Sequence, residues 1–130
     1  MQPVTTDLFI GGAARPAAGG ATYDIVNPAR PSELVGHAAA ASREDIDAAM
    51  RAAHDAFPAW SGLSMAYRAA HLRNVAEHLN ADAEDTAARA RLLSREHGKT
   101  LFETNIEITR LADRLAQVAG FADGLEDEDR

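Results

Sequence analysis

The stretch LLSREHGKTLFET, residues 92–104, decides how this sequence is interpreted. It contains Gly98-Lys99-Thr100, which match the last three residues of a phosphate-binding P-loop. A P-loop also needs a glycine five residues before this one, because its backbone N–H groups must curl around the phosphates. Leu93 stands at that position, in a segment with helical periodicity. We therefore reject a P-loop.

A joint between two helices explains the same residues. Glycine often ends a helix in the left-handed conformation, because it has no Cβ atom. Thr100 and Glu103 have the T-x-x-E spacing of a capping box, in which each side chain satisfies a free backbone N–H group at a helix start. The stretch therefore predicts that Gly98 ends one helix and that Thr100 begins the next.

Composition and charge limit the possible functions. The chain has 130 residues, enough for one small domain with a buried core, and 46% of them are hydrophobic. A net charge of −7 argues against nucleic acid as a partner. With no cysteine, the chain has no disulfide, no cysteine-bound zinc and no thiolate nucleophile. Neither a signal peptide nor a membrane-spanning stretch is visible, so we expect a cytoplasmic protein with no membrane partner.

Residues 1–41 form a strand and turn segment that is rich in glycine and proline. Three short runs have strand character: Leu8-Phe9-Ile10, residues 22–26 and Leu34-Val35. Gly11-Gly12 and Gly19-Gly20 are predicted turns, and Asn27-Pro28 ends the second run.

Residues 42–123 have helical periodicity, and residues 124–130 form an acidic tail. Ser42 and Asp45 predict a capped helix that ends at Pro58, and a second helix begins near Ser64. A third helix follows Asn80. With the helix that starts at Thr100, this makes four. We expect an α/β fold fragment with two or three short strands followed by about four helices. The residues predicted to share one apolar interior are Ile46, Met50, Phe57, Leu72, Leu79, Leu111 and Leu115.

No catalytic site can be defined from the residues alone. His71 and His78 lie on one helix face but about 10.5 Å apart along its axis, too far for a shared metal ion without a third element. No Ser-His-Asp arrangement, carboxylate pair or glycine-rich dinucleotide motif is present. We therefore predict no catalytic and no cofactor-binding residues in this chain.

The order of the short motifs nevertheless resembles the opening segment of the aldehyde dehydrogenase superfamily. That segment has a glycine turn after a first strand, a strand that ends in Asn-Pro, a D-V-D-x-A-V helix start, and then A-F-x-x-W, S-x-x-x-R and E-x-G-K. The matching residues are 9–12, Asn27-Pro28, 45–50, Ala56-Phe57 with Trp60, Ser64 with Arg68, and 96–99. Each motif alone is weak, but the ordered set is specific and covers nearly the whole chain.

The resemblance implies an NAD(P)-dependent enzyme that oxidises an aldehyde to a carboxylic acid by attack of a cysteine thiolate. Because this chain has no cysteine, we expect an N-terminal fragment that is inactive alone and binds neither NAD nor NADP. Residues 42–123 would pack on the NAD(P)-binding domain of the family. The expected partners are the remaining segment of the same enzyme, an aldehyde substrate for the full-length protein and further copies in a homo-oligomer.

The resemblance also implies one metal site. In some members of the family a main-chain carbonyl near the Asn-Pro and an acidic residue beside the Gly-Lys hold a structural monovalent cation. The matching positions are Val26 and Glu96. A solvated glutamate near a helix end is the alternative interpretation of Glu96.

A second class of function stays open at this point. The alternative hypothesis is that the chain is a stand-alone, non-enzymatic helical interaction module derived from the same family. The coding sequence that follows Arg130 would distinguish the two. The aldehyde substrate and the choice between NAD and NADP depend on segments that this sequence does not contain.

Overall fold

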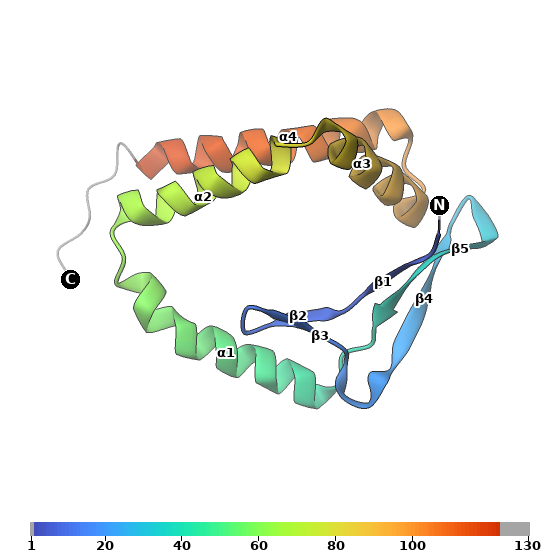
Figure 1. Cartoon of the computed structure of the whole chain (residues 1–130), viewed down its shortest axis with the longest axis horizontal. Coiled ribbons are helices and arrows are strands. Elements are labelled where there is room, and N and C mark those ends of the chain that lie inside the picture. The colour runs from blue at the N-terminus through green and yellow to red at the C-terminus, as the bar shows by residue number, and fades with distance from the viewer. Residues whose placement is uncertain (1, 123–130) are drawn as a thin grey trace. The chain divides into compact units, whose positions relative to one another are not determined.

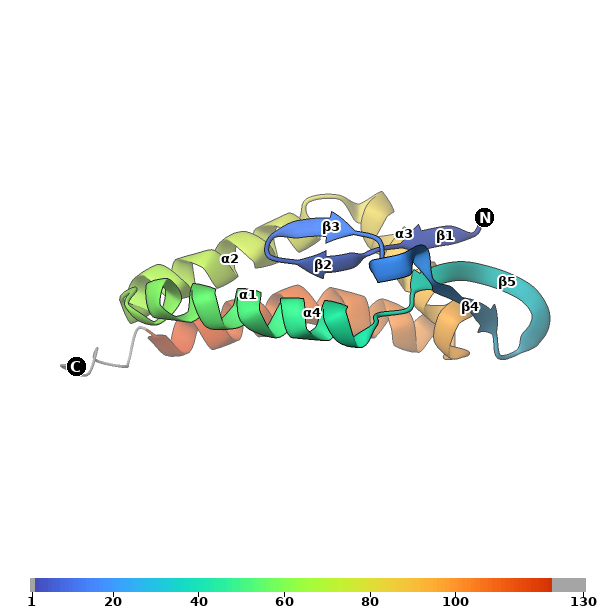
Figure 2. The ribbon, with the colours of Figure 1, turned by 90° about the horizontal axis from the view of Figure 1, so that it is seen from below.

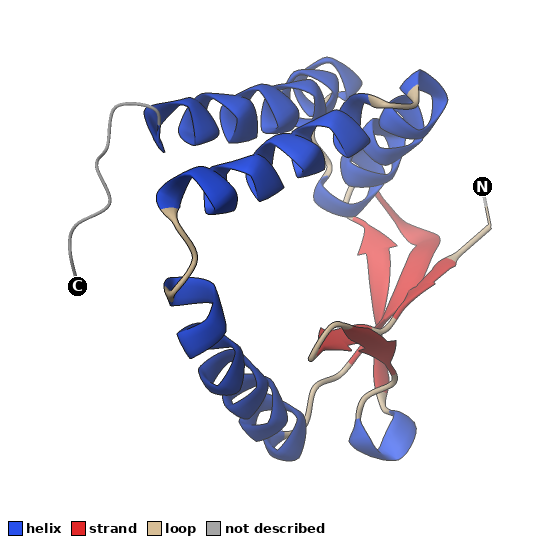
Figure 3. Ribbon diagram, turned by 60° about the vertical axis from the view of Figure 1, so that its left-hand side comes forward, coloured by secondary structure: helices blue, strands red, loops and turns tan. Residues whose placement is uncertain are grey.

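The computed structural model describes residues 2–122 of the chain, so the acidic tail at 124–130 lies outside the described residues. In the described part, five strands of three to ten residues are followed by four α-helices (Figures 1 and 3), which confirms the predicted α/β fragment. The chain divides into two compact units. One comprises Met1–Pro58 with Arg95–Gly98, and the other comprises Ala59–Ser94 with Lys99–Arg130. No helix within residues 2–122 is both long and apolar enough to cross a membrane.

The first unit contains a three-stranded sheet with the order β1-β5-β4. The central strand β5 (Arg30–Ala39) pairs in parallel with β1 (Val4–Thr6) and antiparallel with β4 (Thr22–Asn27). The β4–β5 pairing is irregular on both sides of Val26, where the register shifts as in a β-bulge. This irregular part of the sheet adjoins the Asn27-Pro28 turn.

A separate hairpin of β2 (Leu8–Ile10) and β3 (Ala13–Arg15) belongs to the same unit (Figure 2). Gly11 and Gly12 join the two strands, and both have positive φ, 63° and 84°. Two-residue hairpin turns of type I′ need positive φ at both positions, which glycine adopts without steric cost. The predicted turn at Gly11-Gly12 is therefore confirmed.

Two strands escape sequence-based prediction. The three predicted runs correspond to β2, β4 and β5, but β1 and β3 were not among the expected two or three strands. β1 and β3 are only three residues long, with the sequences VTT and AAR. Most of their residues are exposed. Neither strand has the alternation of apolar and polar residues that marks a half-buried strand.

The helix α1 (Arg43–Ser61) begins as predicted, with Ser42 and Asp45 bonded to each other as a capping box. The predicted end at Pro58 is wrong, because the helix continues to Ser61 with Pro58 in its last turn. Proline has no N–H group to bond to the carbonyl four residues earlier, and the helix ends three residues after it. The first compact unit nevertheless ends at this proline.

The second unit is helical. It contains α2 (Met65–Asn80), α4 (Leu101–Phe121) and α3 (Ala83–His97), except that the last residues of α3 belong to the first unit. α2 packs against α4 (Figure 1), and most of the buried residues of these two helices are alanines. Small side chains allow two helices to approach closely. The buried alanines of α2 and α4 are Ala69, Ala76, Ala112 and Ala119.

The predicted shared interior of large apolar residues is wrong. Ile46, Met50 and Phe57 lie in the first unit and are 55%, 68% and 64% exposed. Leu72, Leu79 and Leu115 lie in the second unit and are half-buried, whereas Leu111 is exposed. Helical periodicity does not say which face of a helix is covered: the buried residues of α4 are Thr104, Ala112 and Ala119, and the buried residue of α1 is Asp45.

Candidate functional site

A cluster of polar contacts in the first unit begins at the Asn27-Pro28 turn. Asn27 is only 5% exposed. Its Oδ1 accepts a hydrogen bond from Ala29 N–H at 2.9 Å, which closes an Asx turn, and its Nδ2 donates to Glu33 Oε2 at 2.9 Å. Pro28 itself has no N–H group to satisfy. The side chain of Asn27 therefore fixes the turn and links it to β5.

Glu33 joins this turn to the end of α3. Arg95 Nε donates to Glu33 Oε1 at 2.7 Å, and Arg30 Nε lies 3.5 Å from the other oxygen. These contacts lower the pKa of Glu33, chiefly through the hydrogen bond from Arg95 and then through that from Asn27. Residues 62 positions apart in the sequence are thus held together by a charged hydrogen bond.

Gly98, the cap of α3, lies against Pro28. Its φ is +72°, as predicted for a left-handed helix cap. A Cβ atom at this position would lie 2.8 Å from Pro28 Cγ. Two independent reasons therefore favour glycine at this position: the backbone conformation and the closeness of the proline ring. The sequence predicted the first reason and missed the second.

The two predicted cation ligands lie on the two segments that this cluster joins. Val26 precedes the Asn27-Pro28 turn and occupies the irregular position of β4. Glu96 is half-buried and lies two residues before Gly98. Because Pro28 contacts Gly98, the segments that carry Val26 and Glu96 are neighbours in the fold. The cation site itself stays a prediction.

Carbonyl and carboxylate oxygens are the donors that hard cations prefer. Within residues 2–122 no group of three His, Cys, Asp or Glu side chains could hold a metal ion. The predicted pair at Val26 and Glu96 consists of one main-chain oxygen and one carboxylate.

The Thr100 side chain caps α4, and the Lys99 side chain forms an ion pair with the same helix. Glu103 N–H donates to Thr100 Oγ1 at 3.3 Å, and Thr100 N–H donates to Glu103 Oε2 at 3.1 Å, which confirms the predicted capping box. The Thr100 hydroxyl and then its N–H lower the pKa of Glu103. Lys99 Nζ lies 2.7 Å from Glu107 Oε2. These residues form the predicted helix joint.

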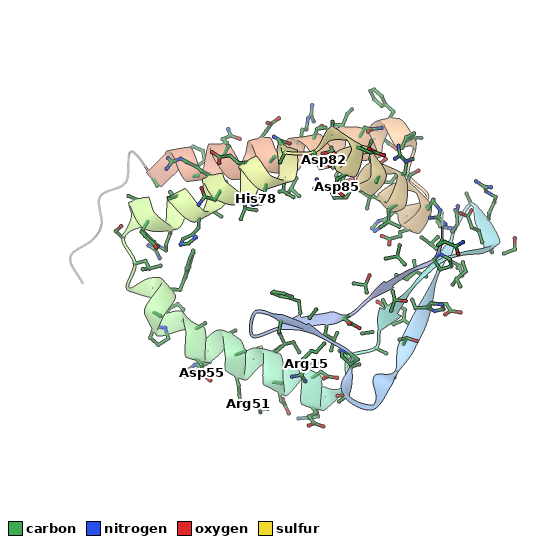
Figure 4. The ribbon with its side chains drawn as sticks, in the orientation of Figure 1. Arg15, Arg51, Asp55, His78, Asp82 and Asp85 are labelled. Carbon is green, nitrogen blue, oxygen red and sulfur yellow. The ribbon has the colours of Figure 1, made fainter. Side chains whose placement is uncertain are left out.

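Asp45 has a larger role than the capping box predicted from sequence. Its side chain is fully buried and also accepts hydrogen bonds from Ala18 N–H at 2.9 Å and from Arg15 Nη2 at 3.1 Å (Arg15 is labelled in Figure 4). The N–H groups of Ser42 and then of Ala18 lower its pKa to about 2. Asp45 therefore ties the start of α1 to the segment after β3.

The two histidines on α2 have separate partners. The ring of His71 packs against Tyr67 and Trp60, with centroid distances of 5.0 and 5.8 Å. Nδ1 of His78 (Figure 4) lies 3.0 Å from the carbonyl oxygen of Asn74. Both histidines line a groove together with Arg89. The Arg89 guanidinium donates to the Leu79 carbonyl and forms an ion pair with Asp85. We find no arrangement for acid–base or nucleophilic catalysis there.

Comparison with known proteins settles the family. A sequence model of the aldehyde dehydrogenase family matches residues 15–130. This chain belongs to the aldehyde dehydrogenase family. Over 74 residues it is 47% identical to vanillin dehydrogenase of Pseudomonas fluorescens, and the alignment covers 57% of this chain and 15% of that protein.

Solved aldehyde dehydrogenases have the same fold over nearly the whole chain. The NAD-dependent aldehyde dehydrogenase from Sinorhizobium meliloti superposes with a TM-score of 0.88 and 32% identity, over 96% of this chain and 25% of that one. Lactaldehyde dehydrogenase from Escherichia coli superposes with a TM-score of 0.85 and 28% identity, over 99% of this chain and 27% of that one. The chain thus spans about a quarter of the length of these two aldehyde dehydrogenases.

Proposed function

We propose that this chain forms the N-terminal part of an NAD(P)-dependent aldehyde dehydrogenase that oxidises an aldehyde to a carboxylic acid. The superposition on 25% of the Sinorhizobium meliloti enzyme carries this proposal, because it extends over 96% of the present chain at 32% identity. The ordered motifs at 27–28 and 96–99 lie in contacting segments, which supports the same assignment.

The chemistry belongs to the rest of the enzyme. An acyl-transferring thiolate is required in this family, and the present chain contains no cysteine. NAD or NADP, when bound, accepts the hydride that leaves the substrate. The contribution of this chain is structural, since its buried polar contacts at Asn27 and Asp45 hold strands and helix ends in place. The isolated chain is therefore inactive and binds no cofactor.

The partners follow from this assignment. The chain packs on the remaining segment of the same enzyme, and the complete protein is a cytoplasmic homo-oligomer that acts on an aldehyde. With a net charge of −7, the chain has no nucleic acid partner. Residues 42–123 contribute the helices that lie on the NAD(P)-binding domain.

A monovalent cation belongs to the same proposal. The Val26 carbonyl and the Glu96 carboxylate would be two of its ligands, and the rest of the enzyme would complete the set. The positions of the two segments support this role, because Pro28, two residues after Val26, lies against Gly98, two residues after Glu96. Such an ion would stabilise the fold and take no part in the reaction.

The coding sequence tests the proposed function. We expect the reading frame that follows the codon for Arg130 to continue, directly or after a frameshift, into a segment that encodes a cysteine. A stop codon with no such remnant downstream would contradict the enzyme and favour a stand-alone interaction module.

A further inference from the structure

The helix α1 has an apolar stripe that no described residue of its own compact unit covers. Ile46, Met50, Ala53 and Phe57 recur at intervals of four, three and four residues, which places them on one face of the helix. Each is exposed, and the three large side chains are 55%, 68% and 64% exposed. We refer to these four residues as the α1 stripe. All four belong to the first compact unit.

The α1 stripe is distinct from the side of the helix that packs within this unit. Asp45 is the buried residue of α1, and Ala52 approaches the Gly11 turn of the hairpin. At 100° per residue, these two residues lie roughly 120° around the helix from the centre of the stripe. The helix therefore has one side that is already packed and a second apolar side that is not.

The remaining side of α1 is charged. Arg51 and Asp55 (Figure 4) are exposed there, as expected for the face of a helix that stays in water. A continuous row of large apolar side chains beside such a face is unusual on a free surface and marks a place of contact. We therefore expect an apolar surface of a partner to pack on the stripe.

We propose that the α1 stripe is the docking face for the rest of the aldehyde dehydrogenase polypeptide. This inference rests on the proposed function. In the Sinorhizobium meliloti and Escherichia coli enzymes the matching segment has the same fold within chains about four times as long. Most of each of those proteins therefore lies outside the matched segment and is available to cover it. The partner surface is apolar and lies within the segment that follows the matching quarter of the family chain.

Two variants of the 130-residue chain test whether the stripe is open. Met50→Glu places a charge in the stripe, and Arg51→Gln is its matched control on the charged side. Both lower the net charge by one, and both new residues favour helix. We expect Met50→Glu to reduce the fluorescence of bound anilinonaphthalene sulfonate by about twofold, and Arg51→Gln to leave it unchanged. Equal dye signals from the two variants would overturn the inference. Circular dichroism confirms that both variants retain their helices.

The partner is tested in a graft, in which this chain replaces the matching segment of the Sinorhizobium meliloti enzyme. A charge buried in an apolar contact without a partner is costly. We therefore expect Met50→Glu to lower the thermal midpoint of the graft by about 5 °C or more relative to Arg51→Gln. The docking inference would be overturned if the graft forms NADH and its two variants have the same thermal midpoint. That result would leave the proposed function intact. A folded graft that forms no NADH would contradict the proposed function instead.

The other possible occupant is a second copy of this chain. Two results together would assign the stripe to that second copy. The free chain would self-associate unless it carries Met50→Glu, and the two graft variants would have equal thermal midpoints. This result would also overturn the inference. Loss of stability confined to the Met50→Glu graft supports it.

Discussion

Gly98 lies so close to Pro28 that a Cβ atom on Gly98 would be 2.8 Å from Pro28 Cγ, although the two residues are 70 positions apart in the sequence (98 − 28 = 70). Gly98 ends α3, and Pro28 forms the turn between β4 and β5. The ion pair of Arg95 with Glu33 lies beside this contact and joins the same two segments. The Asn-Pro turn therefore lies against the glycine of the Gly-Lys motif.

Substitution of Gly98 by alanine should destabilise the chain. The left-handed conformation costs a residue with a Cβ atom about 1–2 kcal/mol, and the approach to the Pro28 ring adds to this cost. Gly120→Ala is the control, because a Cβ atom added at Gly120 in α4 would meet nothing within 4 Å and alanine favours helix. Urea unfolding of both variants measures the difference. Equal stabilities would show that Gly98 is not constrained by its surroundings.

Acid should weaken the fold through Asp45. Its pKa is lowered from 3.8 to about 2 in the folded protein, chiefly by the N–H groups of Ser42 and Ala18. Its contribution to the free energy of unfolding is therefore fully present above about pH 4 and is lost as the pH falls towards 2. Asp45→Asn should be less stable at neutral pH and should lose less stability between pH 4 and pH 2. Asp47→Asn, an exposed neighbour, is the control, and an Asp45→Asn acid profile parallel to the wild type would refute the assignment.

The capping box at the start of α4 should contribute measurably. Thr100→Ala removes the acceptor for Glu103 N–H, and loss of such a cap lowers stability by about 1 kcal/mol. Thr109→Ala, an exposed site inside the same helix, should instead raise stability by up to about 0.5 kcal/mol, because alanine is the better helix former. Chemical denaturation distinguishes the two. The two changes in the free energy of unfolding should have opposite signs. A Thr100→Ala variant as stable as the wild type would exclude an energetic role for the box.

The proposed cation should be detectable in the graft of this chain into the Sinorhizobium meliloti enzyme. Sodium or potassium chloride should raise its thermal midpoint relative to choline chloride at equal ionic strength, because an ion that binds only the folded state stabilises it. Glu96→Gln should remove this difference. Glu77→Gln, on the exposed surface of α2, should retain it. The ligand assignment fails if the salt dependence of the Glu96→Gln graft equals that of the control.

Features set by neighbouring residues could be predicted from the sequence. The capping box of Ser42 with Asp45, the glycine cap at Gly98 and the box of Thr100 with Glu103 all depend on contacts within a few residues. Their chemistry is therefore visible in a short stretch of sequence. Two of the five strands found within residues 2–122 were missed, because each has only three mostly exposed residues and no alternating pattern.

Contacts between distant residues could not be predicted in this way. Nothing near Glu33 indicates Arg95 as its partner, and nothing near Asp45 indicates Arg15. The exposure of the α1 stripe was missed for a related reason. An apolar periodicity shows which face of a helix avoids water, but whether that face is covered depends on the rest of the protein.

Activity of the graft tests the central claim most directly. The measurement is the rate of aldehyde-dependent NADH formation by the Sinorhizobium meliloti enzyme that carries this chain in place of its matching segment, beside the 130-residue chain alone. We predict turnover by the graft and none by the free chain, because the free chain contains no cysteine to attack the aldehyde. A folded, inactive graft or turnover by the free chain would contradict the assignment of this chain as the supporting N-terminal part of an aldehyde dehydrogenase.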